Sequence, residues 1–156
     1  MNSARLPVER FAFLEMLAIW MGEVRNKNLE KQFNITRQQA YKDFALFQAL
    51  HPDHLIKLDK ACYIFADDKQ PHYFGGSLDD FLLWLETGHF ATSTPLFNAF
   101  ASRLKLPERR VSRRIVAALV QAIQQRLRID VNYISLSNPE EEGRIFSPHS
   151  IVKAGS

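Results

Sequence analysis

The chain has 156 residues, enough for one ordinary domain or two small ones, and 46% hydrophobic with 24% charged residues is typical of a globular rather than a disordered protein. No apolar run approaches the ~18 residues of a membrane-spanning helix, and the first residues lack the apolar segment and cleavage site of a signal peptide. The net charge of +3 is mild, and the single cysteine, Cys62, excludes an intramolecular disulfide, argues against a cysteine-based zinc site and indicates a cytoplasmic protein.

The first half of the chain predicts three helices. Residues 8–21 are apolar nearly all round, which indicates a central helix that stops at Gly22. A short helix follows in "KNLEKQF", with Asn26 as its candidate N-cap. Thr36 and the glutamine three residues later form a capping-box pattern, so the third helix is expected to begin at residue 37 and to end before Pro52.

Two short strands around Asp59 and Lys60 in "HLIKLDKACYIFAD" predict a small hairpin. The order helix, helix, tight turn, helix, hairpin predicts a winged helix-turn-helix over residues 1–75.

Helices are expected next, over residues 76–127, as a linking and dimerisation region. Ser77 caps "LDDFLLWLETG", "LFNAFASRL" is a short helix, and "LPERRVSRRIVAALVQAIQQRL" is a long basic one. The expected apolar stripe of the long helix is Val111, Ile115, Ala118, Leu119 and Ala122. The alternation in "RIDVNYISL" predicts a strand with which "RIFSPHSIV" could pair.

The third helix has two chemically different faces when drawn at 100° per residue. Ala40, Phe44 and Phe47 lie together and are expected in the core, with Asp43 toward the same side and paired with a neighbouring donor. The first two turns of the opposite face suit DNA, because Gln pairs with adenine edges, Arg with guanine edges, and Lys and Tyr with phosphates. The candidate DNA-binding residues are Thr36, Arg37, Gln38, Gln39, Tyr41 and Lys42, with Arg25, Lys57 and Lys60 as further candidates. For the residues of the third helix, the alternative interpretation is an ordinary solvated helix face. For Lys57 and Lys60, it is a solvated turn.

Charge is separated along the chain. Residues 103–128 carry eight basic residues against one acidic, a balance of +7, whereas residues 61–102 carry one basic against five acidic, a balance of −4. Such separation suggests surfaces with different partners, although a solvated helix face is equally compatible. The candidates for phosphate or dimer contacts in the basic stretch are Arg109, Arg110, Arg113 and Arg114.

Catalytic and metal motifs are absent from the sequence. His51 and His54 flank Asp53 at a spacing that could hold a metal. They lie at a helix end with no further ligand nearby in the sequence, which favours an ordinary turn, and the other three histidines (His72, His89 and His149) are isolated. We therefore expect no enzyme activity, no cofactor and no metal.

Several short motifs resemble the WYL-domain transcriptional regulators that guard bacterial anti-phage islands, the BrxR/CapW type. The matching N-terminal positions are Trp20, Gly22, Val24, Leu29, Phe33, Ile35, Thr36, Gln39, Ala40, Asp43, Phe47, Gln48, Pro52 and Tyr63. "LPERRVSRRIVAALVQAI" is similar to the linking helix of the family. Residues 128–156 are similar to the opening strands of its WYL domain through Tyr133, Ser135, Arg144, Pro148 and His149.

The resemblance implies a mainly α protein with a small β component (α+β): a winged helix-turn-helix, linking helices, and the first strands of an incomplete WYL domain, which is a small β-barrel. It also implies a homodimeric repressor that binds an inverted repeat in double-stranded DNA and that an effector relieves at a complete WYL domain. Partial ligand-domain residues are then Tyr133, Ser135, Arg144 and His149.

Two departures from the family pattern stand out. The pattern continues beyond Ser156, so we expect a fragment or a truncated form with strand edges left to pair elsewhere. Tyr41 and Lys42 replace the small residue that is more common before Asp43, which leaves the operator sequence open. The alternative function is a protein-interaction module that pairs with full-length copies; an RNA- or single-strand-binding accessory is a third class, which would need exposed aromatics on a sheet.

Overall fold

The computed structural model describes residues 7–75, 78–90, 111–134 and 142–152. The chain divides into two compact units, residues 1–110 and 111–156, and each is described by itself. Within the described ranges, no helix is both long and apolar enough to cross a membrane.

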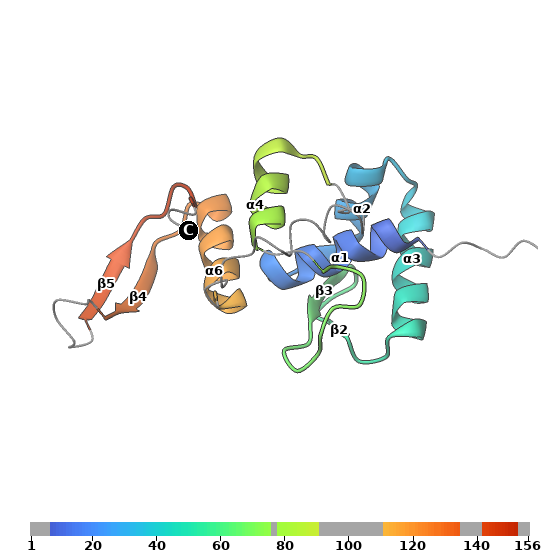
Figure 1. The fold of residues 1–156 in the computed structure, drawn as a ribbon, viewed down its shortest axis with the longest axis horizontal. Helices are drawn as coiled ribbons and strands as arrows, with labels where there is room; N and C mark the ends of the chain where they lie inside the picture. Colours follow the sequence, from blue (N-terminus) through green and yellow to red (C-terminus); the bar gives the residue numbers. More distant parts are fainter. Residues whose placement is uncertain (1–6, 76–77, 91–110, 135–141, 153–156) are drawn as a thin grey trace, which may run out of the picture. The chain divides into compact units, whose positions relative to one another are not determined.

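Helix α1, Val8–Trp20, is the centre of the first unit, and it contacts α2, α3, α4 and the sheet (Figure 1). Its residues from Phe11 to Trp20 are all buried, as the nearly uniform apolar sequence predicts. The helix ends where Gly22 takes a positive φ of 81°, a conformation that costs glycine little. The predicted helix and its stop are therefore confirmed.

Helices α2, Asn26–Phe33, and α3, Arg37–Leu50, are joined by a tight turn in which Asn34 is left-handed with φ 50°. Thr36 caps α3, because its hydroxyl accepts the backbone N–H of Gln39 at 3.2 Å. The predicted start of α3 is confirmed. The prediction that Asn26 caps α2 is wrong: Asn26 is the first helical residue, and the Asn28 side chain accepts the backbone N–H of Arg25 at 2.7 Å.

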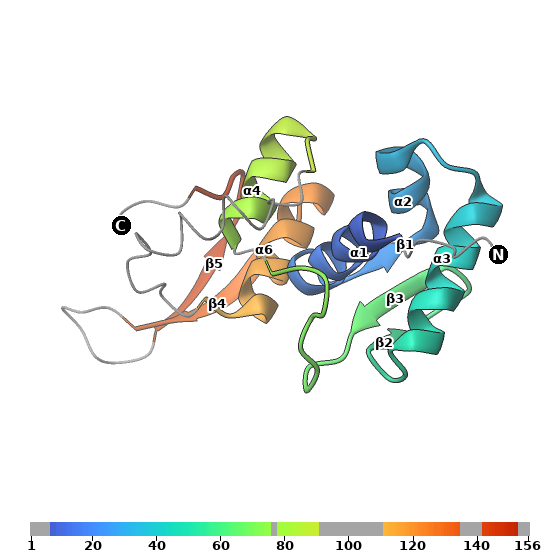
Figure 2. The ribbon, with the colours of Figure 1, turned by 45° about the vertical axis from the view of Figure 1, so that its right-hand side comes forward.

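The predicted hairpin is present as β2, Leu55–Lys57, and β3, Cys62–Phe65, paired antiparallel with Leu55 opposite Phe65 and Lys57 opposite Tyr63. The sequence did not predict the third strand, β1, Val24–Arg25, which pairs with the other edge of β3 (Figure 2). The sheet order is thus β1-β3-β2. The hairpin is thereby attached to the segment that leads into α2.

Aromatic contacts join these elements. Phe11 of α1 meets Phe47 of α3 edge to face, with ring centroids 5.3 Å apart. Phe44 of α3 stacks on Tyr63 of β3 at 4.7 Å. Each such pair stabilises a core by about 0.5–1.5 kcal/mol in addition to the free energy gained by burying its apolar area. Here the pairs fix α3 between α1 and the hairpin.

Helix α4, Leu78–Thr87, also belongs to the first unit, since the ring centroids of its Trp84 and of Phe13 in α1 are 5.3 Å apart. The Trp84 indole donates to Gln32 Oε1 of α2 at 3.0 Å, and Gln32 in turn donates to the carbonyl of Gly88 at 3.2 Å. Gly88 has a positive φ of 70° directly after the helix, as predicted. The predicted cap Ser77 and the predicted helix in "LFNAFASRL" lie outside the described residues.

The segment 67–74 after β3 is held by a buried acid of α1. The Glu15 carboxylate, fully buried, accepts the backbone N–H groups of His72, Tyr73 and Phe74, each at 2.8 Å. Burial raises the pKa of Glu15, and the three N–H donors counteract part of that rise. The contact brings residues 72–74 against α1.

The second unit contains α6, Arg113–Gln125, and the antiparallel strands β4, Ile129–Tyr133, and β5, Glu142–Phe146. The predicted pairing of the two terminal strands is confirmed. The predicted apolar stripe of the long helix is largely wrong, since Val111 precedes the helix and Ile115 is 61% exposed. The buried residues of α6 are Val116, Ala117, Val120 and Ala122.

Candidate nucleic-acid interface

The first two turns of α3 present one exposed polar face. Arg37, Gln38, Tyr41 and Lys42 are all exposed on it, and Ala45 and Ala49 continue it toward the helix end. The Arg37 Nη2 donates to the Tyr41 hydroxyl at 3.4 Å, and its guanidinium carbon lies 5.5 Å from the centre of the Tyr41 ring. This contact orders both long side chains at the start of the helix. We call the exposed set Arg37, Gln38, Tyr41 and Lys42 the α3 face.

The opposite side of α3 is anchored in the core, as predicted. Ala40, Phe44 and Phe47 are buried, and the Asp43 carboxylate is only 2% exposed. It accepts hydrogen bonds from Arg10 Nε at 2.6 Å and Nη2 at 3.1 Å, a bidentate ion pair that fits the planar guanidinium. The expectation that Asp43 has a structural role and a neighbouring donor is confirmed, but no sequence signal identified Arg10 as that donor.

Gln39 lies between the two faces and is half-buried. Its amide nitrogen donates to Asp43 Oδ1 at 3.0 Å, so the side chain points toward the core pair. Thr36, the cap, is exposed beside it. Of the candidates at the start of α3, the structure therefore brings four together on the α3 face and gives two a structural contact.

Three further candidates lie in the small sheet of the first unit. Lys57 and Lys60 are exposed, one at the end of β2 and one in the turn. Arg25 of β1 donates to Glu23 Oε1 at 3.0 Å and lies 3.6 Å from Asp59 Oδ2. The hydrogen bond to Glu23 raises the pKa of Arg25. The Arg25 guanidinium is thus already paired with the acidic side chains of Glu23 and Asp59.

The candidates between residues 109 and 149 are separate from this face in the sequence, and only some are described. Arg113 is half-buried and Arg114 exposed at the start of α6, whereas Arg109, Arg110 and Ser135 lie outside the described residues. The Arg144 guanidinium carbon of β5 lies 5.4 Å from the centre of the Tyr133 ring of β4. His149 is exposed after β5.

The thiol of Cys62 in β3 is free and buried. Burial raises the pKa of the Cys62 thiol to about 11, so the thiolate that acts as nucleophile or metal ligand is scarce at neutral pH.

The prediction that His72 is isolated is wrong. The segment held by Glu15 brings the His72 ring to within 4.3 Å, centre to centre, of His51 and within 4.9 Å of His54.

The arrangement of α2, the tight turn and α3, with the hairpin alongside, defines a winged helix-turn-helix domain. Residues 8–87 match the family model of the BrxR transcriptional regulator winged helix-turn-helix domain, and the chain belongs to this family. The expected resemblance is thereby confirmed for the N-terminal half.

Curated relatives agree with this family. The chain is 28% identical over 154 residues to the DNA-binding transcriptional repressor CapW of Escherichia coli strain KTE188, covering 94% of this chain and 51% of that protein. It is 26% identical to CapW of Pseudomonas aeruginosa, with 94% and 51% covered, and 24% identical to CapW of Stenotrophomonas maltophilia, with 91% and 50% covered. The chain thus spans about half the length of the curated relatives it matches.

Proposed function

We propose that the chain is a sequence-specific reader of double-stranded DNA and part of a transcriptional repressor. The α3 face carries this proposal: four DNA-compatible side chains are exposed together on the first two turns after the tight turn, on the side away from the core. These are the turns with which recognition helices contact bases. The relatives that match over almost the whole chain are named DNA-binding transcriptional repressors, which supports the same function.

The side chains of the α3 face divide into two roles. Gln38 has the paired donor and acceptor that match an adenine edge, and Arg37 has the fork that matches a guanine edge. Lys42 and Tyr41 suit phosphates, while Ala45 is small enough for close approach to the groove. Thr36 and Gln39 position the helix start, and Lys57 and Lys60 of the hairpin supply further phosphate contacts beside it.

We propose a homodimer on an inverted repeat. A single recognition helix contacts only a few base pairs, so adequate specificity requires two half-sites related by the symmetry of the protein. Arg109, Arg110, Arg113 and Arg114 are the proposed phosphate or dimer contacts of the basic stretch. By the family resemblance, the regulated genes are anti-phage defence genes, and an effector acts through a complete WYL domain that includes Tyr133, Ser135, Arg144 and His149.

Selection of bound sequences from a random pool of duplex DNA tests this function directly. The expected result is enrichment of one palindromic consensus, with half-sites about one helical turn, or a multiple of it, apart. Failure to enrich any sequence, at a salt concentration where a known winged-helix repressor enriches its operator, would contradict specific DNA reading. Enrichment of an unpaired half-site would contradict the dimer.

Gln38→Ala is expected to lose discrimination at one or two base pairs of the selected operator. A good bidentate base contact is worth about 1–3 kcal/mol, so the affinity difference between the operator and its single-base variants should fall by that amount at those positions. Fluorescence anisotropy with a set of base-substituted duplexes measures it. Gln48→Ala, in the last turns of the same helix, is the matched control and should leave the base preferences unchanged.

Lys42→Ala is expected to weaken binding to all duplexes about equally and to flatten the salt dependence. Removing one phosphate contact should reduce the slope of log affinity against log salt by about 0.9. Anisotropy titrations across salt concentrations, on operator and on scrambled DNA, give both quantities. Lys69→Ala removes a lysine that pairs with Asp68 at 3.4 Å instead, and its slope should equal that of the wild type.

A protein-interaction module is the second candidate, and the hairpin β4–β5 favours it. In the part of the second unit that the structure describes, Ile134, Ile145 and Phe146 are 65%, 72% and 44% exposed, and the sheet has only two strands with both edges unpaired. Such edges and apolar side chains suit pairing with further polypeptide. Native mass spectrometry of this chain mixed with a full-length relative tests it, and hetero-dimers are the result expected of such a module.

A further inference from the structure

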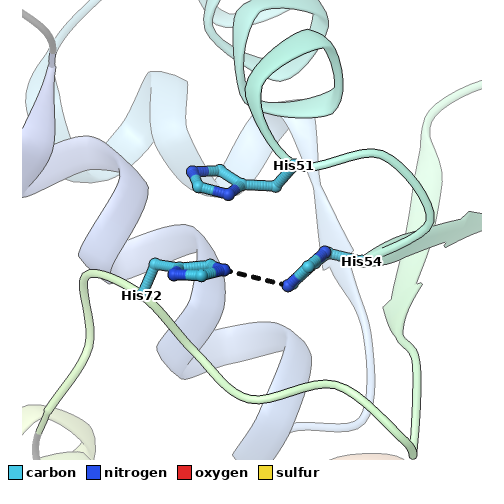
Figure 3. Close-up of side chains that lie close together, drawn as sticks. All are labelled: His51, His54 and His72. Atoms are coloured by element: carbon cyan, nitrogen blue, oxygen red, sulfur yellow. Dashed lines mark hydrogen bonds between the residues drawn. The ribbon is translucent and has the colours of Figure 1, made fainter.

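Three histidines from separate parts of the first unit meet at the end of α3 (Figure 3). His51 is the C-cap of α3, His54 directly precedes β2, and His72 comes from the segment after β3. One ring nitrogen from each lies within 4.8 Å of the other two, and the Nε2 atoms of His54 and His72 are 3.1 Å apart. We call these three residues the histidine cluster.

We propose that the histidine cluster binds one divalent transition-metal ion, with zinc as the first candidate. In a tetrahedral zinc site with Zn–N distances of 2.0–2.1 Å, the ligand nitrogens are ~3.4 Å apart. The 3.1 Å separation of His54 and His72 is already close to that value. The three ligand nitrogens lie within 4.8 Å of one another, so the widest separation has to shorten by ~1.4 Å when an ion binds, a change within the reach of small side-chain rotations.

The outer nitrogens of two rings already have the partners that metal-bound histidines require. His54 Nδ1 lies 3.2 Å from the carbonyl oxygen of Pro52, which can only accept, so Nδ1 carries the hydrogen and Nε2 keeps its lone pair. His51 Nε2 lies 2.8 Å from the Tyr73 hydroxyl. When Nε2 donates to that oxygen, Nδ1 of His51 is the free ligand atom. Such partners fix the tautomer and orientation of histidine ligands in metal sites.

The chemistry of the donors selects the class of ion. Three neutral imidazoles suit zinc, copper, nickel and cobalt, whereas magnesium and calcium prefer oxygen ligands. His72 is exposed, so an ion can enter from solvent, and a water molecule can complete the fourth position. A bound ion would join the end of α3, the start of the hairpin and the segment after β3 at one point.

Titration of the tag-free, metal-stripped chain tests the site independently of DNA. Calorimetry with zinc should give one ion per chain, and cobalt should give the intense visible absorption of a four- or five-coordinate ion. His72→Gln and His54→Gln should each lower zinc affinity about 100-fold or more, because loss of an outer partner alone costs 10–100-fold. His89→Gln, which removes a histidine outside the cluster, should bind as the wild type.

Tyr73→Phe sharpens the test, because it keeps the ring and removes only the hydroxyl that contacts His51. A fall in zinc affinity of about 10–100-fold is expected. Circular dichroism of every variant establishes that it is folded. The proposal is overturned if the wild type binds no stoichiometric ion, if His72→Gln and His54→Gln bind as tightly as the wild type, or if cobalt keeps the pale spectrum of its hydrated ion.

Discussion

Replacing Asp43 with alanine is expected to destabilise the winged helix-turn-helix by about 3–5 kcal/mol, the cost of breaking a buried ion pair from one side. Asp43 is 2% exposed and Arg10, 28% exposed, reaches it with two nitrogens, so removing the carboxylate leaves the guanidinium partly buried and unpaired. The amide of Gln39 loses its acceptor as well. Chemical denaturation followed by circular dichroism measures the change.

Two controls separate the ion pair from a general effect of removing an aspartate. Asp68→Ala breaks the exposed pair with Lys69, in which Asp68 is 76% exposed, and should change stability by less than about 1 kcal/mol. The double replacement Arg10→Met with Asp43→Leu removes both charges and should be clearly more stable than Asp43→Ala. A loss below about 1 kcal/mol in Asp43→Ala, or a double variant less stable than the single one, would contradict this interpretation.

The pair also connects the fold to the proposed interface. Asp43 and the α3 face belong to the same helix, so the contact with Arg10 of α1 sets the rotation at which that face is presented. Asp43→Ala should therefore reduce affinity for the selected operator even under conditions in which the variant is still folded. The sequence indicated one partner of this ion pair, the acid on the inner side of an amphipathic helix, but not Arg10.

Elements with local signals could be predicted from the sequence. Helix α3 begins at Arg37 because Thr36 caps it, and it ends before Pro52, and both signals lie within a few residues of the ends. The hairpin β2–β3 has its turn residues between two apolar runs. The exposed and buried faces of α3 follow from helical periodicity alone, since its phenylalanines recur at the spacing of one face.

Features created by distant pairing could not be predicted. Strand β1 has two residues, and it is a strand only because Val24 and Arg25 pair with Tyr63 and Cys62 of β3. The buried stripe of α6 depends on which side its neighbours cover, and helical spacing offered more than one apolar side. The histidine cluster required the position of His72, which the Glu15 contact determines and which no local pattern contains.

Glu15→Ala is expected to cost about 3–5 kcal/mol of stability. The carboxylate is fully buried and accepts three backbone N–H groups, all at 2.8 Å, and each buried donor left without a partner costs about 1–3 kcal/mol. Glu15→Gln keeps the shape and one acceptor oxygen but turns an NH₂ group toward at least one of these donors. Its loss should be smaller, about 1–3 kcal/mol, and Glu9→Gln, at an exposed position of the same helix, should lose less than about 0.5 kcal/mol.

The Glu15 variants also test whether α1 controls the histidine cluster. Because the carboxylate holds residues 72–74, its loss should free that segment, and hydrogen exchange of the amides of His72, Tyr73 and Phe74 should accelerate more than exchange in α1 itself. Zinc affinity should fall in Glu15→Gln although all three histidines remain. Equal acceleration throughout the unit would show global destabilisation instead, and unchanged exchange at residues 72–74 would contradict the role assigned to Glu15.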